Sequence, residues 1–165
     1  MIIDGSYFTG VLSLGINFDT GAESITKKAE LDTLQSYIDL YERKYLRLML
    51  GKNMSRQFID YLSSTKDDMP QWEALKDKLS VKGRSPIANY VYFFYVSKRG
   101  VKPTPVGPVY TSDGELANPN SLLVSAWNDM VEMNIDLCDF LYGNTEYEGF
   151  DPDASMFECI NAMGI

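Results

Sequence analysis

The chain has 165 residues, 45% of them hydrophobic, which suits a single globular domain with a core of its own. It contains no histidine, and its net charge of −8 makes free duplex DNA an unfavourable partner. No apolar run reaches the roughly 18 residues of a membrane span, and the first residues lack the pattern of a signal peptide. We therefore expect no transmembrane segment.

Charge is distributed unevenly along the chain. Residues 1–102 hold all 15 basic residues together with 12 acidic ones, whereas residues 103–165 hold 11 acidic residues and no basic one. The simpler interpretation is a solvated acidic surface. The more specific interpretation is a polarised molecule with two different neighbours.

The first 25 residues mix aromatic and aliphatic side chains with glycines, and their apolar residues alternate between Leu12 and Phe18. Alternation of this kind predicts extended chain. Two strands alone are barely stable, so we expect an extended N-terminal arm over residues 1–25 that this domain or a partner holds. We assign the apolar side chains of the arm to partner binding: Tyr7, Phe8, Val11, Leu12, Leu14 and Phe18.

A long amphipathic helix is expected next, over residues 27–50. Apolar residues recur three and four apart from Leu31 to Leu48, and charged residues such as Glu42 fill the other side. Gly51 follows the last turn, where a left-handed glycine commonly ends a helix.

Similar patterns and helix-start signals such as Ser85–Pro86 predict four more helices. These are at residues 53–63, 70–79, 86–98 and 121–142. The fold class is therefore mainly α, a helical bundle over residues 26–142. We expect its core to include Leu34, Ile38, Tyr41, Leu48, Ile87, Val91, Phe94, Trp127 and Met130.

Residues 100–120 interrupt this pattern with four prolines and three glycines. These residues exclude a helix and predict a protruding, hairpin-like loop. Long loops in compact domains are often functional, so we assign this loop to partner binding as well. The residues concerned are Val101, Val106, Val109 and Tyr110.

Residues 143–165 form an acidic C-terminal segment, in which Asp151–Pro152 is expected to start a short helix. We expect the acidic third of the chain to present one acidic face, which either lines a bore or meets a basic partner. Its test residues are Asp136, Asp139, Glu146 and Glu148. The two cysteines, Cys138 and Cys159, have no metal-type spacing and are expected to be buried free thiols.

Motifs that carry chemistry are sparse. The cysteines have no histidine to activate them, and no phosphate-binding glycine loop or nucleophile elbow occurs. Asp39 with Glu42, and Asp136 with Asp139, place carboxylates one turn apart, but such pairs are usually solvated. We expect no catalytic residue, no cofactor and no metal. A metal-dependent enzyme that uses only carboxylates is the least favoured interpretation.

Four stretches together resemble a known class of proteins. They are the YIDLYERKYLRLMLG helix, the W-x-x-L of Trp72–Leu75, the SPIANYVYFFYV helix, and PTPVGPV ahead of the helix with Trp127–Met130. Over most of residues 1–142 the combination resembles head–tail connector (portal adaptor) proteins of tailed phages and prophages of Bacteroides-type bacteria. No counterpart covers residues 143–165.

The resemblance implies a virion structural protein of the phage neck, assembled in the cytoplasm of the bacterial host. Such a protein docks on the portal as a ring of twelve copies and joins it to tail-side neck proteins, while DNA passes through the bore without specific binding. No membrane is involved, and no catalytic residue is implied. The alternative is a standalone helical protein-interaction module, such as a prophage assembly or regulatory factor.

Overall fold

A computed structural model describes residues 1–14, 25–64, 69–99, 101–104, 107–110 and 119–161. Its α-helices are α1 (Ile25–Leu50), α2 (Lys52–Ser63), α3 (Pro70–Leu79), α4 (Pro86–Arg99) and α5 (Pro119–Tyr142). Short 3-10 helices are η1 (Gly5–Tyr7), η2 (Gly10–Leu12) and η3 (Ala154–Phe157). The predicted mainly α fold is confirmed, and each α-helix lies within two residues of its expected bounds.

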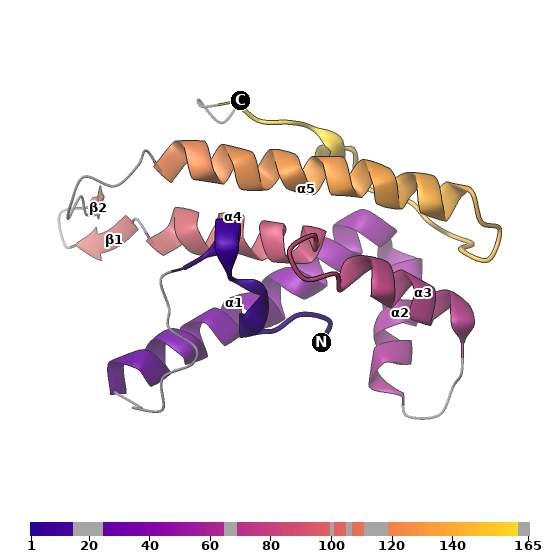
Figure 1. Ribbon diagram of the computed structural model, residues 1–165, viewed down its shortest axis with the longest axis horizontal. Helices are drawn as coiled ribbons and strands as arrows, with labels where there is room; N and C mark the ends of the chain where they lie inside the picture. Colours follow the sequence, from indigo (N-terminus) through magenta and orange to yellow (C-terminus); the bar gives the residue numbers. More distant parts are fainter. Residues whose placement is uncertain (15–24, 65–68, 100, 105–106, 111–118, 162–165) are drawn as a thin grey trace.

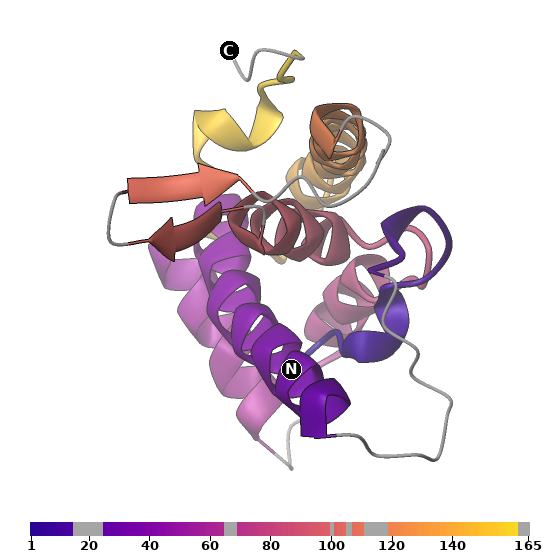
Figure 2. The ribbon, with the colours of Figure 1, turned by 90° about the vertical axis from the view of Figure 1, so that its left-hand side faces the viewer.

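Helix α4 runs through the middle of the bundle, with α5 on one side and α1 on the other (Figure 1, and end-on in Figure 2). A helix in this position must bury opposite faces, which explains its nearly continuous apolar sequence. Ile87 and Val91 have no exposed surface, and the aromatic rings of Tyr90 and Tyr95 are buried as well.

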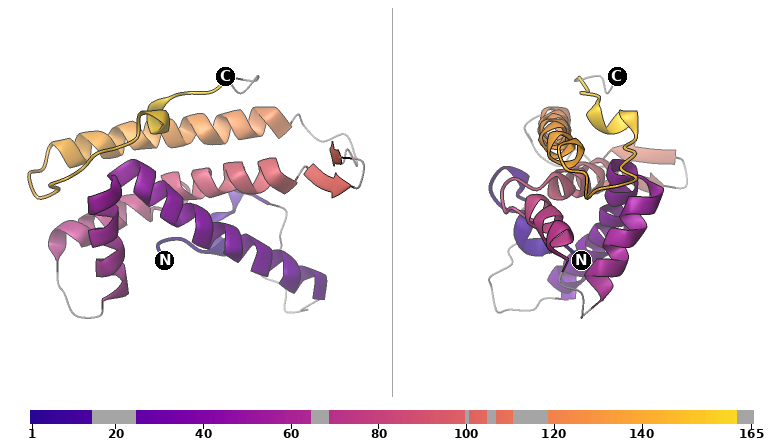
Figure 3. Two further views of the ribbon diagram at one scale, coloured as in Figure 1. Left: turned by 180° about the vertical axis from the view of Figure 1, so that it is seen from behind. Right: turned by 90° about the vertical axis from the view of Figure 1, so that its right-hand side faces the viewer.

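The turn between α1 and α2 depends on Gly51. Its φ of +78° is positive, which favours glycine, but its ψ of 169° lies outside the left-handed helical conformation that the sequence predicted. A Cβ atom at this position would also lie 2.8 Å from the carbonyl oxygen of Asp151. Glycine is therefore required both by the backbone conformation and by the close approach of the C-terminal segment. The two helices that it joins form a V (Figure 3).

A buried chain of hydrogen bonds ties α1 to α5 and to η3. Tyr45 Oη donates to Asn134 Oδ1 at 2.6 Å, and Asn134 Nδ2 donates to the Met156 carbonyl oxygen at 2.8 Å. Both polar side chains are completely buried. Burial raises the pKa of Tyr45 well above its ordinary value, so the hydroxyl keeps its proton and acts as the donor. Every buried side-chain polar atom in the described ranges has a hydrogen-bond partner.

Most of the expected core residues are buried, and three are only partly so. Leu34, Ile38, Tyr41, Ile87, Val91 and Met130 are buried, whereas Leu48, Phe94 and Trp127 are partly buried and pack against the core. Leu40, also on α1, is 61% exposed.

Candidate functional site

The N-terminal segment is part of the core. Residues 1–14 form η1 and η2, and Tyr7, Phe8 and Leu12 are 9%, 1% and 8% exposed. Tyr7 Oη also donates to the carbonyl oxygen of Ser80, just after α3, at 2.7 Å. The prediction of an extended arm that offers these three side chains to a partner is wrong for the described part. These three side chains pack against an apolar face of their own bundle. Their burial away from water therefore needs no partner protein.

The remaining arm residues have different surroundings. Val11 is 75% exposed and Leu14 is partly buried, so among the described arm residues assigned to partner binding these two keep surface for another molecule. Phe18 lies outside the described residues. The alternation that predicted extended chain begins at Leu12, which the structure places in η2.

Glu42 is the functional group that the sequence analysis missed. It was placed on the polar face of α1, but it is only 4% exposed. Its carboxylate accepts the backbone N–H of Ile2, at 3.1 and 3.0 Å to its two oxygens, and that of Ile3 at 3.1 Å. Burial raises the pKa of Glu42, although these hydrogen bonds work in the opposite direction. The sequence did contain one signal for the burial of Glu42, because this residue lies four positions after the buried Ile38 and so on the same side of the helix.

The hairpin-like loop is present as two antiparallel strands, β1 (Val101–Thr104) and β2 (Gly107–Tyr110). Val101 lies opposite Tyr110, and Thr104 opposite Gly107. The hairpin extends past the end of α4 (Figure 1). In the described part of the chain no third strand pairs with either outer edge. Of the other assigned loop residues, Val109 lies on β2 and Val106 lies outside the described residues.

The four acidic test residues are all exposed but do not form one cluster. Asp136 and Asp139 lie one turn apart on α5, and Asp136 pairs with Arg84 at 2.9 Å. Glu146 instead lines a hollow beside Trp72, and Glu148 lies in the connection to η3. Asp136 and Asp139 therefore share an acidic surface on α5, whereas Glu146 and Glu148 lie in the segment after that helix.

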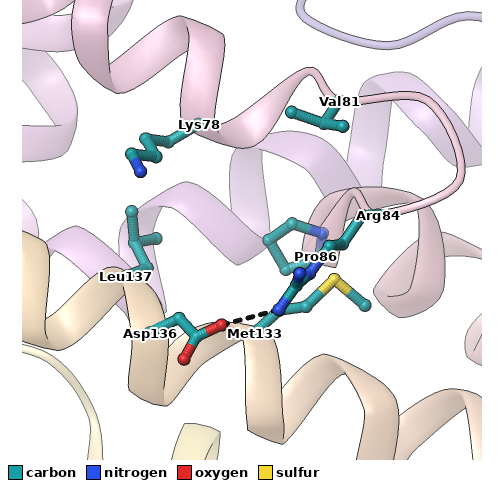
Figure 4. A pocket seen from close by; sticks show the side chains of 7 residues that line it. All are labelled: Lys78, Val81, Arg84, Pro86, Met133, Asp136 and Leu137. Atoms are coloured by element: carbon teal, nitrogen blue, oxygen red, sulfur yellow. Dashed lines mark hydrogen bonds and ion pairs between the residues drawn. The ribbon is translucent and has the colours of Figure 1, made fainter.

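A cleft of about 350 Å³ lies between the α3–α4 connection and α5. Arg84 and Asp136 point toward one another across it, as Figure 4 shows. Both side chains are about two-thirds exposed or more, at 71% and 67%, so this ion pair adds only about 0–1 kcal/mol to stability. The other residues that line the cleft are Lys78, Val81, Pro86, Met133 and Leu137.

The C-terminal segment is held along α5 through its backbone. The carbonyl oxygens of Met156, Glu158 and Ile160 accept hydrogen bonds from Asn134, Trp127 and Asn128 respectively. Asn128 also accepts the N–H of Ile160 at 2.9 Å. Alternate carbonyls thus face one helix, as in an extended strand.

Within this segment the expected short helix is observed as η3, with Asp153 rather than Asp151 as its cap. The Asp153 carboxylate accepts the Ser155 hydroxyl at 2.6 Å and the Ser155 N–H at 2.9 Å, and these two bonds lower the pKa of Asp153. Cys138 is partly buried and Cys159 is exposed, so the expectation of two buried thiols is wrong for Cys159.

Within the described ranges no three His, Cys, Asp or Glu side chains are grouped so that they could hold a metal ion. No helix in that part of the chain combines the length and apolar character needed to cross a membrane. Comparisons with models of known families, with curated proteins and with solved structures find no significant match. The resemblance to phage connector proteins therefore stays a prediction.

Proposed function

We propose that this chain is a virion structural protein, a head–tail connector adaptor that docks on the portal ring and joins it to tail-side neck proteins. The observation that carries the proposal is the β1–β2 hairpin at the end of the bundle. A two-stranded hairpin is barely stable alone. Its outer edges offer backbone C=O groups to a neighbouring protein, but Pro103 and Pro108, which lie opposite each other, have no N–H and limit strand pairing there.

The rest of the molecule supports a scaffolding role for the bundle. The N-terminal segment packs into the core, whereas the other segment assigned to partner binding, the hairpin, extends past the end of α4. Within the described part of the chain, the titratable groups include no metal-binding cluster, and the cleft beside Arg84 is bordered by one exposed ion pair. Such a surface suits contact with another protein better than chemistry on a small substrate.

The test is to replace residues 101–110 with a Gly/Ser linker of the same length. The protein is mixed with the portal protein of the phage or prophage that encodes it and imaged by negative-stain electron microscopy. We expect the unchanged protein to form a ring on the portal. The linker variant should keep its helical circular dichroism but fail to join the ring.

A Gly/Ser replacement of residues 65–68, between α2 and α3, is the matched loop control and should assemble normally. The proposal is refuted if the unchanged protein does not bind the portal and is absent from purified virions by mass spectrometry.

The second candidate is a standalone helical protein-interaction module, an assembly or regulatory factor of a prophage. One observation favours it: in the described ranges a single chain already satisfies its buried side-chain polar atoms, including Tyr45 and Asn134. Presence in infected cells together with absence from virions would support this candidate over the connector.

A further inference from the structure

Two helices carry exposed stripes of equal spacing and opposite charge. Both stripes follow the pattern i, i+3, i+4, i+7, which places four side chains on one helical face. The basic stripe on α1 consists of Leu40, Arg43, Lys44 and Arg47, all exposed. The acidic stripe on α5 consists of Glu132, Ile135, Asp136 and Asp139, also all exposed.

The stripes face away from the core on opposite sides of the molecule. α1 and α5 flank α4, as Figures 1 and 2 show. Ile38 and Tyr45 of α1 are fully buried, and so is Met130 of α5, so each stripe lies on the exposed side of its own helix. On α5 that side includes Glu132 and Asp136, which lie beside the α3–α4 connection. One copy therefore cannot bring its own two stripes together.

The charges of both stripes are available to another molecule. Among the described residues the ion pairs are Lys76–Glu73 and Arg84–Asp136. Of the stripe residues only Asp136 is paired, in a contact that is exposed on both sides and therefore easily exchanged. Lys44 lies with its ammonium 5.2 Å from the ring centre of Phe94, which leaves its charge at the surface.

Each stripe also contains one large apolar side chain in water. Leu40 is 61% exposed beside the basic residues, and Ile135 is 48% exposed among the acidic ones. An apolar centre with a charged rim is the usual composition of a protein–protein contact. The two stripes match each other in spacing, charge and apolar content.

We propose that the basic stripe of one copy docks on the acidic stripe of a second copy. Two basic stripes, or two acidic ones, would place like charges opposite each other and repel. The contact is therefore heterologous, and repeated heterologous contacts close into a ring or grow into a filament. This inference rests on the ring-subunit function proposed above and identifies the lateral partner in the ring as a copy of the same chain.

A contact of this size is weak for an isolated pair. Four side chains on each side cover less area than a stable interface requires, and exposed charges are screened by salt over ~8–10 Å. The contact is populated at low salt and high protein concentration, or where a portal holds the copies side by side and raises their effective concentration.

The experiment uses two charge-reversed variants and sedimentation velocity at low salt. One variant carries Arg43→Glu and Arg47→Glu, and the other carries Glu132→Lys and Asp139→Lys. The unchanged protein should self-associate with increasing concentration, and added salt should dissociate it. Each variant alone should associate at least about tenfold more weakly than the unchanged protein, because its two stripes then carry mostly charges of the same sign. An equal mixture of the variants should regain association, because each offers the stripe that the other needs.

The matched control is Lys28→Glu with Lys82→Glu, two exposed lysines outside the stripes whose reversal changes the net charge as much as the first variant does. The control should associate like the unchanged protein. The inference is overturned if the unchanged protein stays monomeric at low salt, or if the control weakens association as much as the stripe variants do. It is also overturned if reversal of Arg43 and Arg47 abolishes binding to a DNA duplex but leaves self-association intact.

Portal binding separates this inference from the function on which it rests. If both stripe variants still form normal rings on the portal, the lateral contact is wrong and the connector function stands. If the unchanged protein self-associates through its stripes but ignores the portal, the contact stands and the connector function is wrong.

Discussion

The N-terminal segment and the β1–β2 hairpin have a similar composition but different positions in the fold. Both are short, apolar, rich in glycine or proline, and outside the α-helices. Yet Phe8 is 1% exposed inside the bundle, whereas the hairpin extends past the end of α4. The N-terminal segment reaches an open apolar face and a carboxylate that accepts its N–H groups. An apolar stretch therefore becomes a partner site only where its own chain offers no such face.

Among the substitutions that test this difference, Phe8→Ala has the largest expected effect on stability. Because Phe8 is buried against its own bundle, truncation should lower the free energy of unfolding by ~3–5 kcal/mol, as for other buried aromatic residues. Urea unfolding followed by circular dichroism measures the change. The control is Val11→Ala, which should stay within about 0.5 kcal/mol because Val11 is 75% exposed. Equal effects at the two positions would show that the segment is not packed as described.

Glu42→Ala should have the next largest effect. It leaves the buried N–H groups of Ile2 and Ile3 without an acceptor, which costs ~1–3 kcal/mol. The loss should appear in chemical unfolding and as faster amide hydrogen exchange at residues 2 and 3. Asp39→Ala, at an exposed carboxylate one turn earlier on α1, is the control and should leave that exchange unchanged.

The pH dependence of stability tests the environment of the same carboxylate. The folded pKa of Glu42 is raised above its ordinary value of 4.5 because the group is buried. Between pH 4.5 and the raised pKa, the unfolded chain has lost a proton that the folded chain keeps, so this contribution to stability falls as pH rises. It is fully present below pH 4.5.

The measurement is the difference in unfolding free energy between the unchanged protein and Glu42→Gln at several pH values. This difference should decrease as pH rises through that window. Asp4 and Asp153, whose pKa values are lowered, contribute with the opposite sign, but they contribute to both proteins and cancel. A difference that does not vary with pH would mean that Glu42 is solvated.

The smallest expected effect on stability comes from the hairpin. The Gly/Ser replacement of residues 101–110 should change the unfolding free energy of the bundle by less than ~0.5 kcal/mol, because the hairpin lies past the end of α4. Thermal unfolding by calorimetry measures this. A loss as large as that of Phe8→Ala would place the hairpin in the core and remove the distinction between the two regions.

The helices were predictable because their signals are local. Periodic apolar residues, the Ser85–Pro86 start and the glycine at position 51 each act within a few residues. The helices and the start of α4 at Pro86 are observed as predicted, whereas Gly51 has the expected positive φ but not the left-handed helical ψ. The antiparallel hairpin was also predicted, because prolines and glycines exclude a helix locally.

The positions of the terminal segments were not predictable in this way. Whether Phe8 is buried depends on a face formed by helices that are distant in the chain, and alternation of apolar residues carries no information about that face. The acceptor role of Glu42 depends likewise on residues forty positions earlier. The charge split along the chain was visible in the sequence, but only the layered arrangement of α1, α4 and α5 places the basic and acidic stripes on opposite sides.

The contact of the C-terminal segment with the α1–α2 turn affects the order in which the chain can fold during translation. The Asp153 N–H donates to the carbonyl oxygen of Leu48 at 2.8 Å, and Asp151 lies against Gly51. At synthesis rates of ~5–20 residues per second, the ribosome reaches Asp153 about 5–20 s after Leu48. During that time the end of α1 has an unpaired carbonyl, and the apolar surface around it lacks its final cover. We expect slow codons between α5 and η3 to lengthen the exposure of this surface to aggregation.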